Sequence, residues 1–188
     1  MRREFMEALE DSPVIAAIKD DAGLKKCISC DSRVIFVLYG DIIAIPEIVA
    51  QIKAVGKIAM VHVDLISGLG SKEIAIDFLK KNTMADGIIT TKPNLIKRAK
   101  ELELHTILRL FLIDSMAFEN IERQVKAAKP DVIEVLPALM PKIVSKVCRL
   151  STTPVIAGGL ISDKEDVMGL LHAGVTSVSS TDEKVWFV

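Results

Sequence analysis

The chain has 188 residues, of which half are apolar and only 4% are aromatic. This length suits a single domain over residues 1–188 with a full core of Ile, Val, Leu and Ala. The 24 basic and 25 acidic residues leave a net charge of −1, so the chain has no global positive field for holding nucleic acid. No stretch approaches the ~20 apolar residues of a membrane span, and the charged start of the chain lacks the apolar run of a secretory signal. We therefore expect a cytoplasmic protein without a membrane partner.

Short apolar runs recur along the chain, and helical patterns separate most of them. The expected strands are Val14–Ile18, Val34–Leu38, Ile58–Val63, Gly87–Ile89, Thr106–Leu110, Val132–Leu136, Val155–Ala157 and Ser177–Val178. The expected helices are Ile42–Val55, Lys72–Lys81, Asn94–Leu102, Ser115–Ala128, Pro141–Leu150 and Asp163–Ala173. Eight strands that alternate with helices predict an α/β fold, a single-domain closed (β/α)8 TIM-type barrel, and a repeat of about 23 residues requires short loops. An open doubly wound sheet is the alternative.

Cys27 and Cys30 stand in a C-x-x-C spacing. A redox motif of this kind opens a helix in a thioredoxin-like fold, and a zinc site needs two further ligands; the sequence shows neither context. We interpret both residues as small side chains at the end of a short helix, and we expect no metal and no cofactor. With Cys148 the cysteine count is odd, which is typical of a reducing compartment.

The segment Ser67–Ser71 is rich in serine and glycine and follows the third expected strand directly. A flexible loop at this position is a candidate lid over the end of a barrel. A short connection between strand and helix is the alternative interpretation.

Polar residues gather at the carboxyl ends of the expected strands, where barrels of this kind carry their chemistry. The candidate ligand-binding residues are Lys19, His62, Asp64, Arg109 and Glu134. Alternation along a strand places His62 and Asp64 on one face of the third strand. Arg109 and Glu134 come from neighbouring strands, where an ion pair would offset the cost of burying each charge. The alternative is a structural network of ion pairs that closes the end of the barrel.

The three histidines differ in their expected environments. His62 is the residue type that exchanges protons near neutral pH, but no nucleophile is placed beside it, so we name no catalytic residue. His105 starts the fifth expected strand at the opposite end of the barrel, where we expect a structural role. His172 lies on an expected helix, where we expect it to be solvated.

The last two expected strands run into small residues. Gly158 and Gly159 follow the seventh strand, and Ser179 and Ser180 follow the eighth. Glycine allows the backbone to approach an anion closely, and the N-terminus of the helix Asp163–Ala173 adds a positive dipole end. Because barrels of this class build phosphate sites from their last two strand–helix loops, these four residues are the candidate phosphate-binding residues.

Two basic clusters and an apolar end mark the expected surface. The clusters are Lys97, Arg98 and Lys100 on one helix, and Lys142, Lys146 and Arg149 on another. The first cluster either contacts RNA or faces water. The segment Trp186–Val188 either packs on the body of the protein or meets a second subunit of a homo-oligomer.

Six blocks of sequence occur in order between Pro13 and Trp186. They are Pro13–Ala17, Val61–Leu69, Asp86–Lys92, Arg109–Ser115, Pro130–Pro137 and Ile156–Ile161. Together they resemble the glycerol uptake operon antiterminator regulatory proteins. The resemblance implies a (β/α)8-type barrel and a cytoplasmic regulator that binds glycerol 3-phosphate and promotes antitermination or stability of a leader mRNA. It also implies that the four glycine and serine residues hold the phosphate, while the wall near the glycerol moiety is formed by His62, Asp64, Arg109 and Glu134.

A small barrel enzyme is the alternative function. Lys19, His62 and Asp64 stand at strand ends, where an isomerase, aldolase or lyase acting on a phosphorylated small molecule would carry its catalytic groups. The sequence shows neither a clear acid/base pair with a nucleophile nor a cluster of metal ligands, so we favour a ligand-binding regulator over an enzyme.

Overall fold

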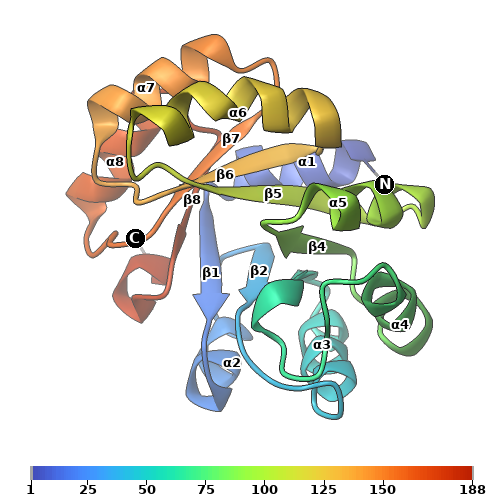
Figure 1. Cartoon of the computed structure of the whole chain (residues 1–188). Helices are drawn as coiled ribbons and strands as arrows, with labels where there is room; N and C mark the ends of the chain where they lie inside the picture. Colours follow the sequence, from blue (N-terminus) through green and yellow to red (C-terminus); the bar gives the residue numbers. More distant parts are fainter. Residues whose placement is uncertain (1, 188) are drawn as a thin grey trace.

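Eight parallel strands close into a barrel within residues 2–187, the part of the chain that this computed structural model describes (Figure 1). The strands are β1 (Val14–Ile18), β2 (Val34–Val37), β3 (Ile58–His62), β4 (Gly87–Thr90), β5 (His105–Phe111), β6 (Val132–Leu136), β7 (Val155–Gly158) and β8 (Ser177–Ser180). β8 pairs with β1, which places Val14 opposite Val178 and Ala16 opposite Ser180. This pairing confirms the closed barrel and excludes the open sheet.

Helices surround the strands, as Figure 1 shows. They are α1 (Arg2–Asp11), α2 (Asp21–Cys27), α3 (Ile45–Ala54), α4 (Ile74–Asn82), α5 (Pro93–Glu101), α6 (Ser115–Ala128), α7 (Pro141–Leu150) and α8 (Lys164–His172), with 3-10 turns η1 (Val63–Leu65) and η2 (Glu183–Phe187). The six expected helices are present as α3 to α8 with small shifts at their ends. α1 is an addition to them, and α2 is the short helix expected beside the cysteine pair. Among residues 2–187, no helix combines the length and apolarity needed to cross a membrane.

Side chains from alternate strand positions fill the interior of the barrel. The fully buried ones include Ile15, Phe36, Met60, Ile89, Ile107, Val132 and Ile156. α1 covers the amino-terminal end of this interior, where Phe5 and Leu9 are fully buried. The ring of Phe5 stacks on the ring of His105 with their centroids 4.5 Å apart. His105 therefore has the structural role expected for it, and burial lowers its pKa.

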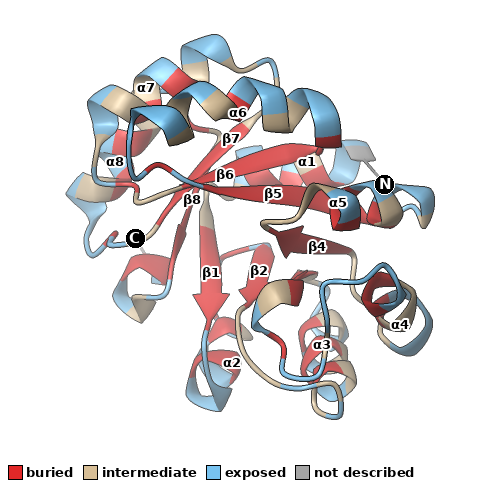
Figure 2. Cartoon of the chain, viewed as in Figure 1, coloured by how far each residue is buried: buried red, intermediate tan, exposed pale blue. Residues whose placement is uncertain are grey.

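The outward-facing strand residues pack beneath the apolar faces of the helices. Figure 2 shows the strands buried, while most of the surrounding helices present both buried and exposed residues. In α7, Val144 and Val147 are buried, whereas Lys146 and Arg149 are exposed. His172 at the end of α8 is exposed, as expected.

Helix-start signals keep the loops at the carboxyl ends of the strands short. Asp20, Asp114 and Asp163 precede α2, α6 and α8, and each carboxylate accepts a hydrogen bond from the amide three residues later. Pro93 and Pro141 stand in the first turns of α5 and α7, where the missing amide hydrogen costs nothing. These caps start each helix soon after its strand, while the pairing of the strands brings their carboxyl ends together at one face of the barrel.

The loop after β3 is anchored where it begins. Ser67 forms a parallel bridge with Asp41: its amide donates to the carbonyl of Gly40 at 3.0 Å, and its carbonyl accepts from the amide of Ile42 at 2.8 Å. Gly68 has a φ of +87°, and a Cβ there would lie 3.0 Å from Ile42. The start of this loop is thus tied to the loop after β2, which favours the interpretation as a short connection over a lid.

Candidate functional site

Four polar side chains point inward at the carboxyl-terminal end of the barrel, which we call the mouth. They are His62 on β3, Arg109 on β5, Glu134 on β6 and Ser179 on β8, with exposed fractions of 3%, 8%, 0% and 4%. Each lies two residues beyond an inward-facing residue of the same strand, so alternation places it on the inner face. The barrel therefore carries an apolar interior below and a polar layer above.

A chain of hydrogen bonds crosses this layer from β5 to β8. The Nε of Arg109 donates to Glu134 at 2.7 Å, and the hydroxyl of Ser179 donates to the other carboxylate oxygen of Glu134 at 2.6 Å. The ion pair between Arg109 and Glu134 confirms the expectation from their strand positions. Because Arg109 reaches Glu134 through Nε, its terminal amino groups have no partner among the described residues and are available to an anion.

Gly158 makes room for this network. It lies opposite Ser179 in the register of β7 and β8. A Cβ at this position would stand 2.4 Å from the hydroxyl of Ser179 and 2.8 Å from the carboxylate of Glu134. The need for glycine at position 158 is therefore explained by the buried carboxylate of Glu134 and does not require a bound phosphate.

His62 has an unsatisfied polar atom in the polar layer. Its Nδ1 is buried and has no hydrogen-bond partner among the described residues. Burial, with a further contribution from the charge of Arg109, lowers the pKa of His62 to about 4. The imidazole is thus neutral near pH 7, and the free Nδ1 is suited to a hydrogen bond with a hydroxyl group.

Asp64 has a different place from the one expected. β3 ends at His62 and the chain turns into η1, so Asp64 does not share a strand face with His62. Its carboxylate accepts hydrogen bonds from Lys92 Nζ at 2.5 Å and from the amide of Thr91 at 2.8 Å, and Thr90 contributes a further one at 3.0 Å. Burial raises the pKa of Asp64, but these hydrogen bonds outweigh it and hold the pKa below its ordinary value. Asp64 therefore fastens η1 to the end of β4, a contact that the sequence pattern missed.

Lys19 lies apart from the polar layer. It follows β1 directly and is exposed, and it has no hydrogen-bond partner among the described residues. It shares the carboxyl-terminal end of the barrel with His62 and Arg109, but the structure does not bring it into their network. Among residues 2–187 it is a cation without a partner, at the same end of the barrel as the mouth.

The loops after β7 and β8 offer backbone amides and not free hydroxyls. Gly159 and Leu160 have φ angles of +85° and +66°, a strained conformation for leucine. Neither of their amides donates to an oxygen of the described residues. The hydroxyl of Ser180 donates to the carbonyl of Ile161 at 2.8 Å, so it is already occupied, as is that of Ser179. An anion at this position would be met by the amides of Gly159 and Leu160.

The C-terminal segment packs on the end of β8. Trp186 is buried, and its Nε1 donates to the carbonyl of Ser180 at 2.8 Å. Phe187 is exposed, and Val188 lies outside the described residues. Of the two expectations for this segment, the structure supports packing on the body for Trp186.

The C-x-x-C pair is structural. Cys27 and Cys30 are both buried, and each thiol donates to a backbone carbonyl of its own turn. Burial raises the pKa of Cys27 to about 12, so its thiol stays protonated. Among the described residues, no three His, Cys, Asp or Glu side chains are placed to share a metal ion.

Together these features define a (β/α)8 barrel protein with a polar mouth at the carboxyl ends of its strands. The chain belongs to the family described as glycerol-3-phosphate responsive antiterminator, whose model matches residues 14–186. The resemblance seen in the sequence blocks is thereby confirmed.

Related proteins match nearly the whole chain. A protein of uncharacterised function from Escherichia coli K12, YgcP, is 46% identical over 182 residues, which cover 97% of this chain and 95% of that protein. The crystal structure of the glycerol uptake operon antiterminator regulatory protein from Listeria monocytogenes is 34% identical, with a TM-score of 0.88 and coverage of 92% and 94%. A glycerol uptake operon antiterminator-related protein from Thermotoga maritima is 35% identical, with a TM-score of 0.82 and coverage of 93% and 98%.

Proposed function

We propose that this protein is a transcription antitermination regulator of glycerol uptake that responds to glycerol 3-phosphate bound at its mouth. The observation that carries the proposal is the family match over residues 14–186, together with two solved relatives at 34% and 35% identity that bear antiterminator names. The polar layer supports it independently, because it presents groups suited to both ends of a polyol phosphate.

The phosphate end of the ligand fits the loop after β7. The amides of Gly159 and Leu160 are free to donate, and the amino groups of Arg109 supply positive charge close to Glu134 and Ser179. Backbone amides and a guanidinium are the usual partners of a phosphate. Ser179 and Ser180 hold this arrangement in place through their hydrogen bonds to Glu134 and to the carbonyl of Ile161, and Gly158 leaves the space that the first of these bonds needs.

The glycerol end fits His62. In the described part of the chain its buried Nδ1 has no hydrogen-bond partner, and a buried polar atom that stays unpaired costs about 1–3 kcal/mol. A ligand hydroxyl would satisfy it and so would bind more tightly than a ligand without one. Asp64 acts through its bonds to the end of β4, and Lys19 adds long-range attraction for an anion.

Calorimetric titration with glycerol 3-phosphate tests this proposal. The wild-type protein should give saturable heat, and Gly159→Asp should abolish it by placing a carboxylate where the phosphate would lie. Gly56→Asp is the matched control, because Gly56 has a φ of +75° and open space around it at the opposite end of the barrel. No heat with the wild type would refute ligand binding, and turnover of triose or pentose phosphates lost in His62→Ala would instead indicate an enzyme.

In this proposal the regulator binds a leader mRNA, and the protein acts in the cytoplasm. The first basic cluster gives this step little support, because Arg98 is bonded to Asp77 and Glu101 and Lys100 is bonded to the carbonyl of Lys129. A gel-shift experiment with a leader transcript at low salt, with and without glycerol 3-phosphate, tests the step. Unchanged mobility in both conditions would refute it.

A further inference from the structure

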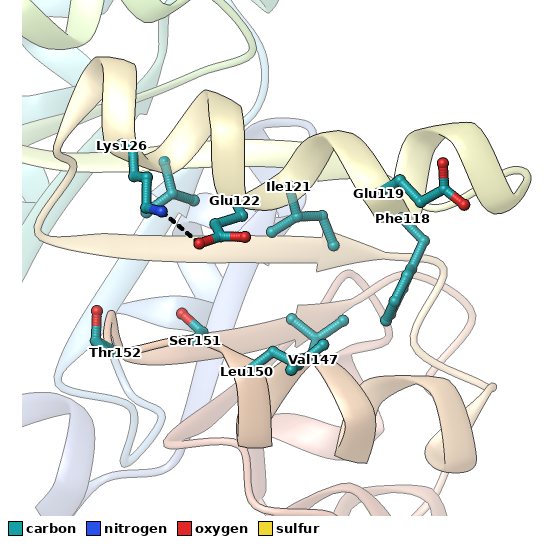
Figure 3. A pocket seen from close by; sticks show the side chains of 10 residues that line it. Phe118, Glu119, Ile121, Glu122, Lys126, Val147, Leu150, Ser151 and Thr152 are labelled. Atoms are coloured by element: carbon teal, nitrogen blue, oxygen red, sulfur yellow. Dashed lines mark hydrogen bonds and ion pairs between the residues drawn. The ribbon is translucent and has the colours of Figure 1, made fainter.

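A groove runs along the outside of the barrel between α6 and α7, away from the mouth (Figure 3). Its volume is about 360 Å³, and a second hollow of about 350 Å³ continues it toward the start of α6. Apolar side chains from both helices line it, among them Phe118, Ile121, Val125, Val147 and Leu150. In Figure 3, Phe118, Ile121, Val147 and Leu150 lie between the two helices, and Glu119, Glu122 and Lys126 are on the α6 side.

The two helices leave this apolar surface uncovered. Of the 14 residues of α6, two are buried, whereas four of the ten residues of α3 are buried. Phe118 and Val125 are half-buried, and Leu150 at the end of α7 is 74% exposed. Apolar side chains gathered in an open groove of a folded protein are suited to a contact with another molecule.

Opposite charges flank the groove on its two sides. α6 contributes Glu119, Glu122 and Lys126 to the lining. Lys126 pairs with Glu122 on the same helix, which leaves Glu119 as the acidic side chain of this set without a partner among the described residues. α7 contributes an exposed basic row, Lys142, Lys146 and Arg149, at helical spacing. Within residues 2–187, none of these three cations has an acidic partner.

A second copy of this chain matches that charge pattern. A two-fold axis parallel to the groove sets α6 of one copy against α7 of the other, so that each acidic side meets a basic side and the apolar residues meet in the middle. RNA matches this charge pattern less well, because three cations can contact only a few phosphates and the adjacent glutamates repel the RNA backbone. A charged rim around an apolar centre is also the usual anatomy of a protein–protein interface.

We propose that the α6–α7 face is the two-fold interface of a homodimer of this protein. The interface buries Phe118, Val125 and Leu150 of both copies. The pairing of Glu119 and Glu122 with Lys146 and Arg149 of the second copy sets its orientation. Because this face lies outside the barrel, the proposal stands or falls independently of ligand binding at the mouth.

Two charge-reversed proteins test the interface. The acid-reversed protein carries Glu119→Lys and Glu122→Lys, and the base-reversed protein carries Lys146→Glu and Arg149→Glu. By light scattering after size exclusion, the wild type should have twice the chain mass of 20.5 kDa. Each reversed protein alone should be monomeric through repulsion between like charges, and an equimolar mixture of the two should return to the dimer mass.

The mixture separates an interface from a folding defect, since a misfolded protein would not be rescued by its counterpart. Lys80→Glu with Lys97→Glu is the matched control, because it makes the same charge change at exposed positions of α4 and α5 and should leave the dimer intact. A wild type of monomer mass at 50 μM, or reversed proteins that remain dimeric alone, would overturn the proposal. If both reversed proteins stay dimeric and only the base-reversed protein loses binding to a leader transcript, the proposal would also be overturned. The basic row of α7 would then be assigned to RNA binding.

Discussion

Glu134 is the residue on which the mouth is built. It is fully buried, and its two carboxylate oxygens are satisfied by Arg109 and Ser179. A buried charge without such partners would be strongly destabilising. Both the space at Gly158 and the orientation of Arg109 are needed to accommodate the buried carboxylate of Glu134.

Replacing Gly158 tests that need. Gly158→Ala should lower the free energy of unfolding by about 1–3 kcal/mol, because the new Cβ overlaps the hydroxyl of Ser179. Urea denaturation measures the change. Gly169→Ala on α8 is the control: nothing lies within 4 Å of its added Cβ, and alanine favours a helix by up to about 1 kcal/mol. Gly158→Ala should cost less in a Ser179→Ala background, where the overlapping hydroxyl is absent, than in the wild type; an equal cost in both backgrounds would contradict the overlap.

His62 should make stability depend on pH. Its pKa is about 4 in the folded protein against about 6.5 in the unfolded chain, so between these pH values the unfolded chain holds a proton that the folded protein lacks. Stability should therefore fall as the pH drops from about 6.5 to about 4, and by about 2 kcal/mol between pH 7.5 and pH 5 from this residue.

Urea denaturation at the two pH values, compared between wild type and variants, isolates the contribution of His62. His62→Gln should lose about 2 kcal/mol less than the wild type between pH 7.5 and pH 5. His172→Gln, at an exposed position, should behave like the wild type. The same pH dependence in His62→Gln and in the wild type would contradict the assignment.

α1 illustrates how one added element completes the barrel. The eight strands enclose an interior that is open at the amino-terminal end until α1 places Phe5 and Leu9 over it. In barrels of this class, residues at the amino-terminal end of the strands mainly stabilise the fold, whereas residues at the carboxyl-terminal end carry function. The helix and the mouth therefore serve separate purposes.

Truncating Phe5 tests this separation. Phe5→Ala should destabilise the protein by about 3–5 kcal/mol through a cavity beside His105, measured by urea denaturation. The affinity for glycerol 3-phosphate should be unchanged under conditions where the variant remains folded, because the mouth lies at the other end. Met84→Ala, at a residue that is 59% exposed, should change stability by less than about 0.5 kcal/mol. A parallel loss of affinity in Phe5→Ala would show that the two ends are coupled.

Ligand binding should be visible in the stability of the whole molecule. A ligand that binds the folded state at 100 times its dissociation constant adds about 2.7 kcal/mol of stability. For a chain of this length that corresponds to a rise in Tm of about 5–10 °C. Thermal scans with glycerol 3-phosphate should show this rise, while glycerol and inorganic phosphate at the same concentration should give smaller ones. Equal shifts with inorganic phosphate would contradict recognition of the glycerol moiety.

Much of the architecture is legible in the sequence because it depends on local patterns. Apolar runs and helical spacing predict the eight strands and six of the helices, and aspartates and prolines mark several helix starts. The placement of Arg109 beside Glu134 is also predictable, since consecutive strands of a barrel are neighbours and both residues stand at equivalent positions.

Contacts between distant segments are a different matter. Alternation makes Asp64 look like a continuation of β3, but the chain turns at His62 so that Asp64 meets the end of β4. The bond from Ser179 to Glu134 joins residues 45 positions apart and exists only when the strands are closed in register. The periodicity of a strand predicts on which face of the sheet each side chain lies. The closure of the barrel and the register of its strands determine which of these side chains come into contact. The sequence thus specifies a barrel with polar strand ends, and the folded chain determines which of those polar groups are bonded to one another and which remain free for a ligand.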